Sequence, residues 1–277
     1  MRLISWNLNA RRAKAPLQVA ALIAREPDIV ALQEVTKSTL PILRAALIAG
    51  GLTNVEDSFS LAPDGFDAKG PRRYGQITAS HYSLSSMPPT LFALPWPERV
   101  LSVRVDVNRR ALDIHNTHIP PGSGNGWTKI AMLNGIHAAL AVSASVPRIL
   151  CGDFNTPQHE TATGEVITWG QRRSSDGSWR VVGTRRGGPG AEWDAGERQV
   201  LTGLADYDLI DVYRALRGYT ETDSSWVLSR GGKETGRRFD HVFASSALRA
   251  VSCSYLHHLR VSGLSDHAPI EVEFDFG

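Results

Sequence analysis

Short, largely apolar runs alternate with amphipathic stretches along the whole chain. Runs that end at a polar residue predict strands at residues 2–6, 28–33, 76–80, 100–107, 111–117, 146–151, 238–244 and 269–276. Apolar residues at three- and four-residue spacing predict helices at residues 16–25, 38–49, 127–143 and 209–216. Because strands and helices are mixed throughout, the pattern indicates an α/β or α+β fold.

Two stretches are less regular than the rest. Residues 172–203 are rich in Gly, Arg and Asp, and we interpret them as a long insertion or an extended hairpin. Residues 231–236 contain several glycines and predict a short flexible loop. Neither change of composition is strong enough to divide the chain, so we expect a single domain over residues 1–277.

Composition narrows the class of protein. The chain is 42% hydrophobic and 21% charged, as is usual for globular proteins, which argues against a disordered chain. No stretch approaches the roughly 18 apolar residues of a transmembrane helix, and the start of the chain lacks the apolar core of a signal peptide. Cys151 and Cys253 are too few for a disulfide scaffold. We therefore expect a cytoplasmic protein that has no membrane partner, and we expect it to be a monomer.

The basic residues are unusual in kind, although the net charge is only +2. Of 30 basic residues, 25 are Arg and 5 are Lys. Guanidinium groups bind phosphate oxygens in a two-pronged geometry that ammonium groups do not adopt. A GC-rich genome gives the same bias without a chemical reason, so both explanations stay open. The arginines often stand in pairs, which are consistent with a phosphate-rich partner: Arg11-Arg12, Arg72-Arg73, Arg109-Arg110, Arg172-Arg173, Arg185-Arg186 and Arg237-Arg238.

Polar clusters follow the apolar runs at the points where these runs end. Loops at one end of a sheet are a common place for a functional site. Carboxylate and amide oxygens, without cysteine, suit a hard cation such as Mg²⁺ or Mn²⁺, and histidines beside them could contact phosphate oxygens. The clusters are Ser5-Trp6-Asn7-Leu8-Asn9, Leu32-Gln33-Glu34, Asn116-Thr117-His118, Gly152-Asp153-Phe154-Asn155, Arg238-Phe239-Asp240-His241 and Ser265-Asp266-His267.

Four of these clusters also have an ordinary structural explanation. Glu34 fits a helix-initiating acid, and Asp153 with Asn155 fits an Asx-turn. Asp240 could pair with the arginine two residues before it, and Asp266 could cap a helix or form a turn. The recurrence of such clusters at the ends of so many apolar runs favours a functional explanation.

Taken together, these residues resemble the endonuclease/exonuclease/phosphatase superfamily in both order and spacing. The resemblance runs from Trp6 to the C-terminus, and its most specific motifs are Gly152-Asp153-Phe154-Asn155 and Ser265-Asp266-His267. It is nearest to the exonuclease III and deoxyribonuclease-like branch. The resemblance implies an α+β fold, built as a four-layer sandwich of two mixed β-sheets flanked by helices. It also implies a Mg²⁺- or Mn²⁺-dependent phosphodiester hydrolase with its site at one end of the sandwich.

The resemblance assigns roles to the oxygen-bearing side chains. By position, Glu34 would be the main metal ligand, assisted by Asn7 and Asp266. Asp153 would orient or deprotonate the attacking water, and Asn155 would position the phosphate or a second metal.

The resemblance also assigns roles to two histidines. His267 would contact the scissile phosphate, with Asp240 holding its ring, and His118 would contact phosphate as well. Whether an aspartate or a histidine is the general base stays open at this stage.

The probable substrate follows from the same resemblance, which favours a nuclease acting on DNA. Residues 204–216, and a Trp ahead of Arg238-Phe239-Asp240, look most like the exonuclease III branch, where this Trp faces DNA. Asn9 and His118 depart from the pattern of abasic endonucleases, so we expect a broader DNA specificity. The expected substrate contacts are Tyr74, Arg172, Arg173, Trp226 and Arg238.

Two other functions remain open. The first is a phosphatase or phosphodiesterase that acts on a small-molecule or lipid phosphate ester. The second is a binding module that has lost catalysis. The presence of every polar residue that the chemistry needs argues against the binding module.

Overall fold

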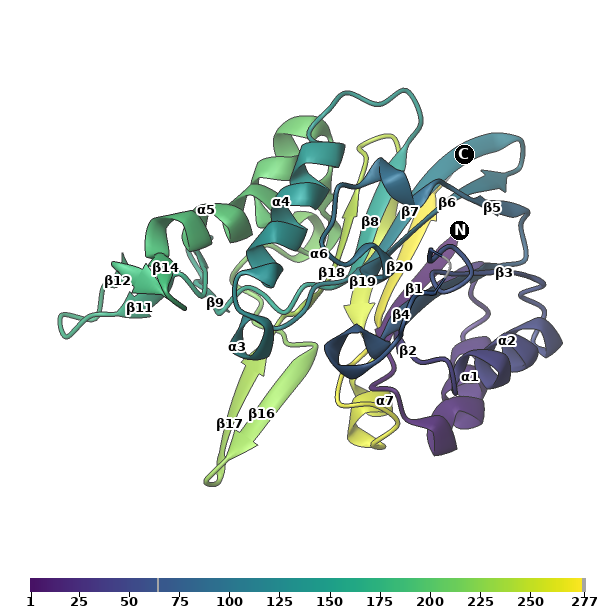
Figure 1. Ribbon diagram of the computed structural model, residues 1–277, viewed down its shortest axis with the longest axis horizontal. Coiled ribbons are helices and arrows are strands. Elements are labelled where there is room, and N and C mark those ends of the chain that lie inside the picture. The colour runs from purple at the N-terminus through teal and green to yellow at the C-terminus, as the bar shows by residue number, and fades with distance from the viewer. Residues whose placement is uncertain (64, 276–277) are drawn as a thin grey trace.

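The computed structural model describes residues 1–63 and 65–275. Two mixed six-stranded sheets lie face to face, and helices cover the outer face of each sheet (Figure 1). The central strands are buried on both faces, which explains why they are continuous apolar runs rather than alternating ones. This arrangement confirms the predicted α+β sandwich of four layers.

The first sheet has the strand order β19-β20-β1-β2-β4-β3. Strands β1 and β2 are parallel and place Asn7 opposite Gln33, while every other pair in this sheet is antiparallel. Its strands are β1 (Arg2–Asn7), β2 (Ile29–Val35), β3 (Asn54–Asp57), β4 (Gly75–Ser80), β19 (Arg249–Tyr255) and β20 (Ile270–Asp275).

The second sheet has the order β15-β18-β8-β7-β6-β5. Strands β7 and β8 are parallel and pair His118 with Asp153, and the antiparallel strand β18 pairs Asp240 with the same Asp153. Three predicted site residues therefore stand side by side at one end of this sheet. Its strands are β5 (Leu84–Ser86), β6 (Val100–Val107), β7 (Arg110–His118), β8 (Arg148–Asp153), β15 (Ile210–Asp211) and β18 (Asp240–Ala244).

Helices complete the outer layers (Figure 1). Helices α1 (Ala15–Ile23), α2 (Leu40–Ala49) and α7 (His257–Val261) pack their apolar side chains on the first sheet. The short helix α3 (Gly122–Asn125) leads into α4 (Thr128–Leu140), which packs with α5 (Gly190–Leu201) on the second sheet. Helix α6 (Val212–Arg217) contacts β18 and β19, one strand from each sheet. Short 3-10 turns lie at Arg12–Lys14, Gly70–Arg73, Pro89–Leu91, Pro97–Arg99 and Gly203–Tyr207.

The irregular segment at residues 172–203 consists largely of regular secondary structure. It forms two small hairpins and then α5, and Trp193 on α5 is fully buried in the core beside α4. Its second half is therefore part of the outer layer of the second sheet. The hairpins are β11 (Gln171–Arg173) with β12 (Trp179–Val181), and β13 (Thr184–Arg185) with β14 (Gly188–Pro189). A further pair, β9 (His159–Glu160) with β10 (Val166–Ile167), precedes them.

The predicted flexible loop at residues 231–236 is wrong. Strands β16 (Trp226–Arg230) and β17 (Lys233–Arg237) form a hairpin that projects from the body of the protein (Figure 1). Gly231 and Gly232 form its turn at φ angles of 57° and 72°, where a residue with a Cβ would be strained. The pattern failed here because a projecting hairpin has no buried face and hence no apolar alternation.

Within residues 1–63 and 65–275, no helix has both the length and the apolar character needed to cross a membrane.

Candidate active site

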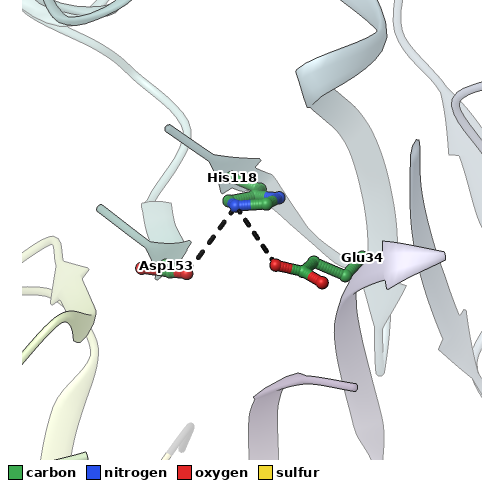
Figure 2. Close-up of side chains that lie close together, drawn as sticks. All are labelled: Glu34, His118 and Asp153. Carbon is green, nitrogen blue, oxygen red and sulfur yellow. Dashed lines mark ion pairs between the residues drawn. The ribbon is translucent and has the colours of Figure 1, made fainter. Parts of the chain in front are cut away.

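A cluster of polar side chains occupies one end of the sandwich, where β2, β7 and β8 end (Figure 2). The imidazole of His118 lies between two carboxylates: its Nε2 is 3.7 Å from Oε1 of Glu34 and 3.7 Å from Oδ2 of Asp153. Glu34 comes from the first sheet and the other two residues come from the second. The site is thus built across the interface of the two sheets.

The backbone at two positions makes this meeting possible. The pairing of β2 with β4 shifts register between Leu32 and Val35, and Glu34 has a φ of 54° within this irregularity. Gly152, the residue before Asp153, has a φ of 135°, and a Cβ there would lie 1.9 Å from the carbonyl oxygen of Thr117. Only glycine permits this close approach of β7 and β8.

Hydrogen bonds orient the Asp153 carboxylate. Nδ2 of Asn7 donates to Oδ2 of Asp153 at 2.8 Å and to Oε1 of Glu34 at 3.2 Å. The backbone N–H of Asn155 donates to Oδ1 of Asp153 at 2.9 Å, the geometry of an Asx-turn. The Asx-turn is therefore confirmed, and it aims the Asp153 carboxylate into the cavity, which is compatible with the predicted functional role.

His267 is held from both sides. Its Nδ1 donates to Oδ2 of Asp240 at 2.7 Å, and its Nε2 lies 3.9 Å from Oδ2 of Asp153. The indole Nε1 of Trp6 donates to the carbonyl oxygen of His267 at 2.9 Å and fixes the loop that carries it. Burial alone would lower the pKa of His267, but the charges of Asp240 and Asp153 outweigh it and raise this pKa to about 10. His267 is therefore an imidazolium at neutral pH.

The pKa values of the other titratable groups in the site shift because of burial and of nearby charges. Burial raises the pKa of Asp153 to about 7, although the nearby His267 opposes the shift. Burial also raises the pKa of Glu34, and the charge of Asp266 adds to the effect. Burial and the positive charge of Arg99 hold the pKa of His118 well below its ordinary value, so that its ring is neutral.

The donor set fits a hard divalent cation. Glu34 and Asp266 line the same cavity, and repulsion by the Asp266 carboxylate adds to burial, the main cause, in raising the pKa of Glu34. A divalent cation between carboxylate oxygens would remove that repulsion. Asn7 steadies the carboxylates of Glu34 and Asp153, because its Nδ2 donates to both. Its Oδ1 accepts from the backbone N–H of Asn9 at 2.9 Å. The role of Asn7 as a metal ligand stays a prediction.

The cavity in front of these groups has a volume of about 510 Å³. Tyr74 and Trp226 line it, as expected of substrate contacts, and Nε1 of Trp226 donates to Oδ2 of Asp266 at 3.3 Å. Arg172 and Arg173 are exposed on β11 and do not line this cavity. Their contact with a longer substrate stays a prediction.

Arg238 requires a correction. Its guanidinium is buried and pairs with Glu160 at 2.6 Å and with Asp211 at 2.7 Å, so it does not face the cavity. Arg214 pairs with the same Glu160 at 2.8 Å. Arg238 thus belongs to a buried ion-pair network that joins the end of the β16–β17 hairpin to β9 and β15. It is not a substrate contact.

Sequence reasoning missed two buried cations beside the site. Arg99 donates to Nδ1 of His118, and its guanidinium stacks 5.1 Å from the ring centroid of Tyr74. Lys129 on α4 donates to the carbonyl oxygen of Asn155 at 3.0 Å and pairs with a buried glutamate. Arginine before a strand and lysine on a helix look like surface residues, so the sequence carries no signal for either.

Comparisons with known proteins find related sequences and similar folds. The chain is 25% identical to the exodeoxyribonuclease III of Haemophilus influenzae, in an alignment that covers 99% of this chain and all of the relative. Its fold is similar to that of an AP endonuclease from Archaeoglobus fulgidus, with a TM-score of 0.70, 21% identity and 99% of each chain covered. It is also similar to D. rerio TDP2 complexed with a single-strand DNA product, with a TM-score of 0.63, 13% identity and coverage of 99% and 98%.

A family model matches residues 4–267, which span every residue of the site described above. The chain therefore belongs to the Endonuclease/Exonuclease/phosphatase family and is a hydrolase of that family.

Proposed function

We propose that this protein is a divalent-metal-dependent nuclease that hydrolyses phosphodiester bonds in DNA. The observation that carries the proposal is the paired arrangement of Asp153 with a charged His267 in front of the cavity, on a fold shared with DNA-processing relatives. Mg²⁺ or Mn²⁺ is the proposed cofactor, because the cavity offers it carboxylate oxygens.

Each side chain has a defined task in this proposal. Glu34 and Asp266 would hold the cation, which when bound supplies positive charge against the phosphate oxygens and favours ionisation of water. Asp153 is placed to take the proton of the attacking water, since its raised pKa of about 7 makes it an effective base near neutral pH. Asn7 and the N–H of Asn155 hold this carboxylate still.

The histidines act on the phosphate itself. The imidazolium of His267 can donate its Nε2–H to a phosphate oxygen and offset the charge that grows there in the transition state. The Asp240 carboxylate keeps that ring charged and aimed. His118 is neutral, and because Arg99 donates to its Nδ1, its proton sits on Nε2 and faces the site.

A cytoplasmic location and a monomeric state are part of the proposal. Cys151 and Cys253 are both buried free thiols, which suits a reducing compartment.

The test is cleavage of plasmid DNA and of an oligonucleotide, with Mg²⁺ and with EDTA. We expect metal-dependent cleavage that Glu34→Gln and His267→Gln each lower by about 100-fold or more. The exposed Glu165 gives a matched control, Glu165→Gln, which should keep full activity. Release of phosphate from small esters, with no cleavage of DNA, would instead identify a phosphatase.

A further inference from the structure

Three arginines line the active-site cavity, and none of them has a carboxylate partner among the described residues. Arg99 donates to His118, which leaves Arg185 and Arg237. Arg185 on β13 and Arg237 on β17 line the same cavity as Glu34 and Asp266. Within residues 1–63 and 65–275, neither takes part in an ion pair. Arg238, the direct neighbour of Arg237, shows the contrast, because it is fully paired with carboxylates.

Both guanidinium groups are partly withdrawn from water. Burial lowers the pKa of Arg185 and that of Arg237, so the positive charge of each is unfavourable where it stands. Nε of Arg185 is buried and finds no hydrogen-bond partner among the described residues. Among the described residues, the guanidinium of Arg237 donates one hydrogen bond, from Nη1 to the carbonyl oxygen of Gly236 at 3.2 Å. An anion in the cavity would satisfy both groups.

An aromatic wall holds the two arginines in place. The guanidinium of Arg237 lies 5.8 Å from the ring centroid of Trp169, and that of Arg185 lies 5.5 Å from Trp193. The backbone N–H of Trp169 and the indole of Trp193 both donate to Glu197, at 2.7 Å and 2.9 Å. Glu197 therefore links Trp169 and Trp193, the two residues that form this wall.

This wall is also hydrogen-bonded to the loop that follows β8 and carries Asn155. Nε1 of Trp169 donates to the carbonyl oxygen of Asn155 at 3.1 Å, and Asn155 in turn orients Asp153. The arginines consequently stand in a fixed relation to the carboxylate that would act as base. A substrate anion bound by them would be positioned with respect to the bond that is cleaved.

We propose that Arg185 and Arg237 form a second anion subsite, which binds the phosphate group next to the scissile phosphate of an oligonucleotide. The inference rests on the proposed nuclease function. The carboxylate end of the cavity takes the scissile phosphate, and the arginine end takes its neighbour, since nucleic acid carries phosphates at regular spacing along each strand. The subsite would make the enzyme prefer oligonucleotides to esters that carry a single phosphate.

The test uses a labelled trinucleotide, which has two linkages. In two further versions, one linkage or the other is an uncharged methylphosphonate, so that only the remaining phosphate can be cleaved. We expect wild-type kcat/KM to fall about tenfold at one linkage when its neighbour is neutral, which corresponds to about 1.4 kcal/mol. Arg185→Gln and Arg237→Gln should each lower kcat/KM about tenfold on the charged trinucleotide and hardly at all on the neutralised one.

Controls separate this subsite from general charge effects. Arg186→Gln and Arg230→Gln remove exposed arginines from the same segments, outside the cavity, and should behave as wild type. Hydrolysis of bis(p-nitrophenyl) phosphate, which has one phosphate, should be unchanged in all four variants and shows that each has folded. Arg237→Lys, which keeps the charge, should restore part of the lost rate.

Two results would overturn the proposal. One is an equal loss on the charged and the neutralised trinucleotides in Arg185→Gln and Arg237→Gln. The other is a wild-type kcat/KM that is the same on the charged trinucleotide and on both versions with a neutral linkage. A wild-type protein that hydrolyses bis(p-nitrophenyl) phosphate but cleaves neither trinucleotide nor plasmid would instead overturn the proposed nuclease function, and the subsite would fall with it.

Discussion

Oδ2 of Asp240 lies 2.7 Å from Nδ1 of His267, and both side chains are buried. The carboxylate fixes the ring and keeps it positively charged. We predict that Asp240→Asn lowers kcat by about 10- to 100-fold with little change in KM, because the ring loses its charged partner while the substrate contacts remain. Steady-state kinetics on DNA measure this. Asp206→Asn, at an exposed carboxylate, is the control, and a wild-type kcat in Asp240→Asn would contradict the assigned role.

We expect Glu34 to lower the stability of the fold when no cation is bound and to contribute to cation binding. Burial, and to a lesser degree the charge of Asp266, raise the pKa of Glu34, so the fold disfavours its ionised form relative to the unfolded chain. We predict that Glu34→Gln raises the free energy of unfolding in EDTA by about 1 kcal/mol. Wild type should gain more stability from Mg²⁺ than the variant does. Urea unfolding with EDTA and with Mg²⁺ gives both quantities, and the same Mg²⁺ gain in both proteins would remove Glu34 as a ligand.

Gly152 should be intolerant of any side chain. Its φ of 135° and the 1.9 Å approach of a Cβ to the carbonyl oxygen of Thr117 would force β7 and β8 apart. We predict that Gly152→Ala destabilises the fold by about 2–4 kcal/mol and lowers activity further, since Asp153 and His118 separate. Thermal unfolding and kinetics measure these effects. Gly203→Ala is the control, because its nearest neighbour would lie at 3.8 Å.

The buried network around Glu160 should control acid stability. Burial would raise the pKa of Glu160, but its bonds to Arg238 and Arg214 outweigh it and lower this pKa from 4.5 to about 2. The folded value lies below the unfolded one, so the contribution of Glu160 to stability is complete above pH 4.5. It is lost as the pH falls from 4.5 towards 2.

Glu160→Gln tests this network. We predict a loss of about 3–5 kcal/mol at pH 7, because two buried guanidinium groups lose a partner, and a flatter pH dependence of stability below pH 4.5. Urea unfolding between pH 7 and pH 3 measures both. Glu192→Gln, at an exposed position, should leave the acid profile as it is in wild type.

The layers and the polar residues at the strand ends could be predicted because both depend on local pattern. Continuous apolar runs indicate strands that are covered on both faces, and a polar residue where such a run ends falls at the edge of the sheet. Glu34, His118 and Asp153 come together for this reason, since β2 of the first sheet and β7 and β8 of the second end at the same end of the sandwich (Figure 2).

The features that could not be predicted share a physical cause, because each depends on contacts with residues far away in the sequence. Strand β19 is largely exposed at a sheet edge and has no apolar run, so nothing local marks it. Arg238 is buried only because Glu160 and Asp211 converge on it. Arg99 faces the cavity and packs against Tyr74, 25 residues before it in the sequence. An isolated arginine looks the same in sequence whether it is solvated, paired or catalytic.

The division of the site between two sheets has a consequence for protein synthesis. Nδ2 of Asn7, near the start of the chain, donates to Asp153 at its middle, and Trp6 holds the loop of His267 near its end. Strand β1 pairs with β20, so β1 lacks this neighbour until β20 has been synthesised. A nascent chain consequently cannot assemble the cluster of Asn7, Asp153 and His267 until residues 265–275 have been synthesised.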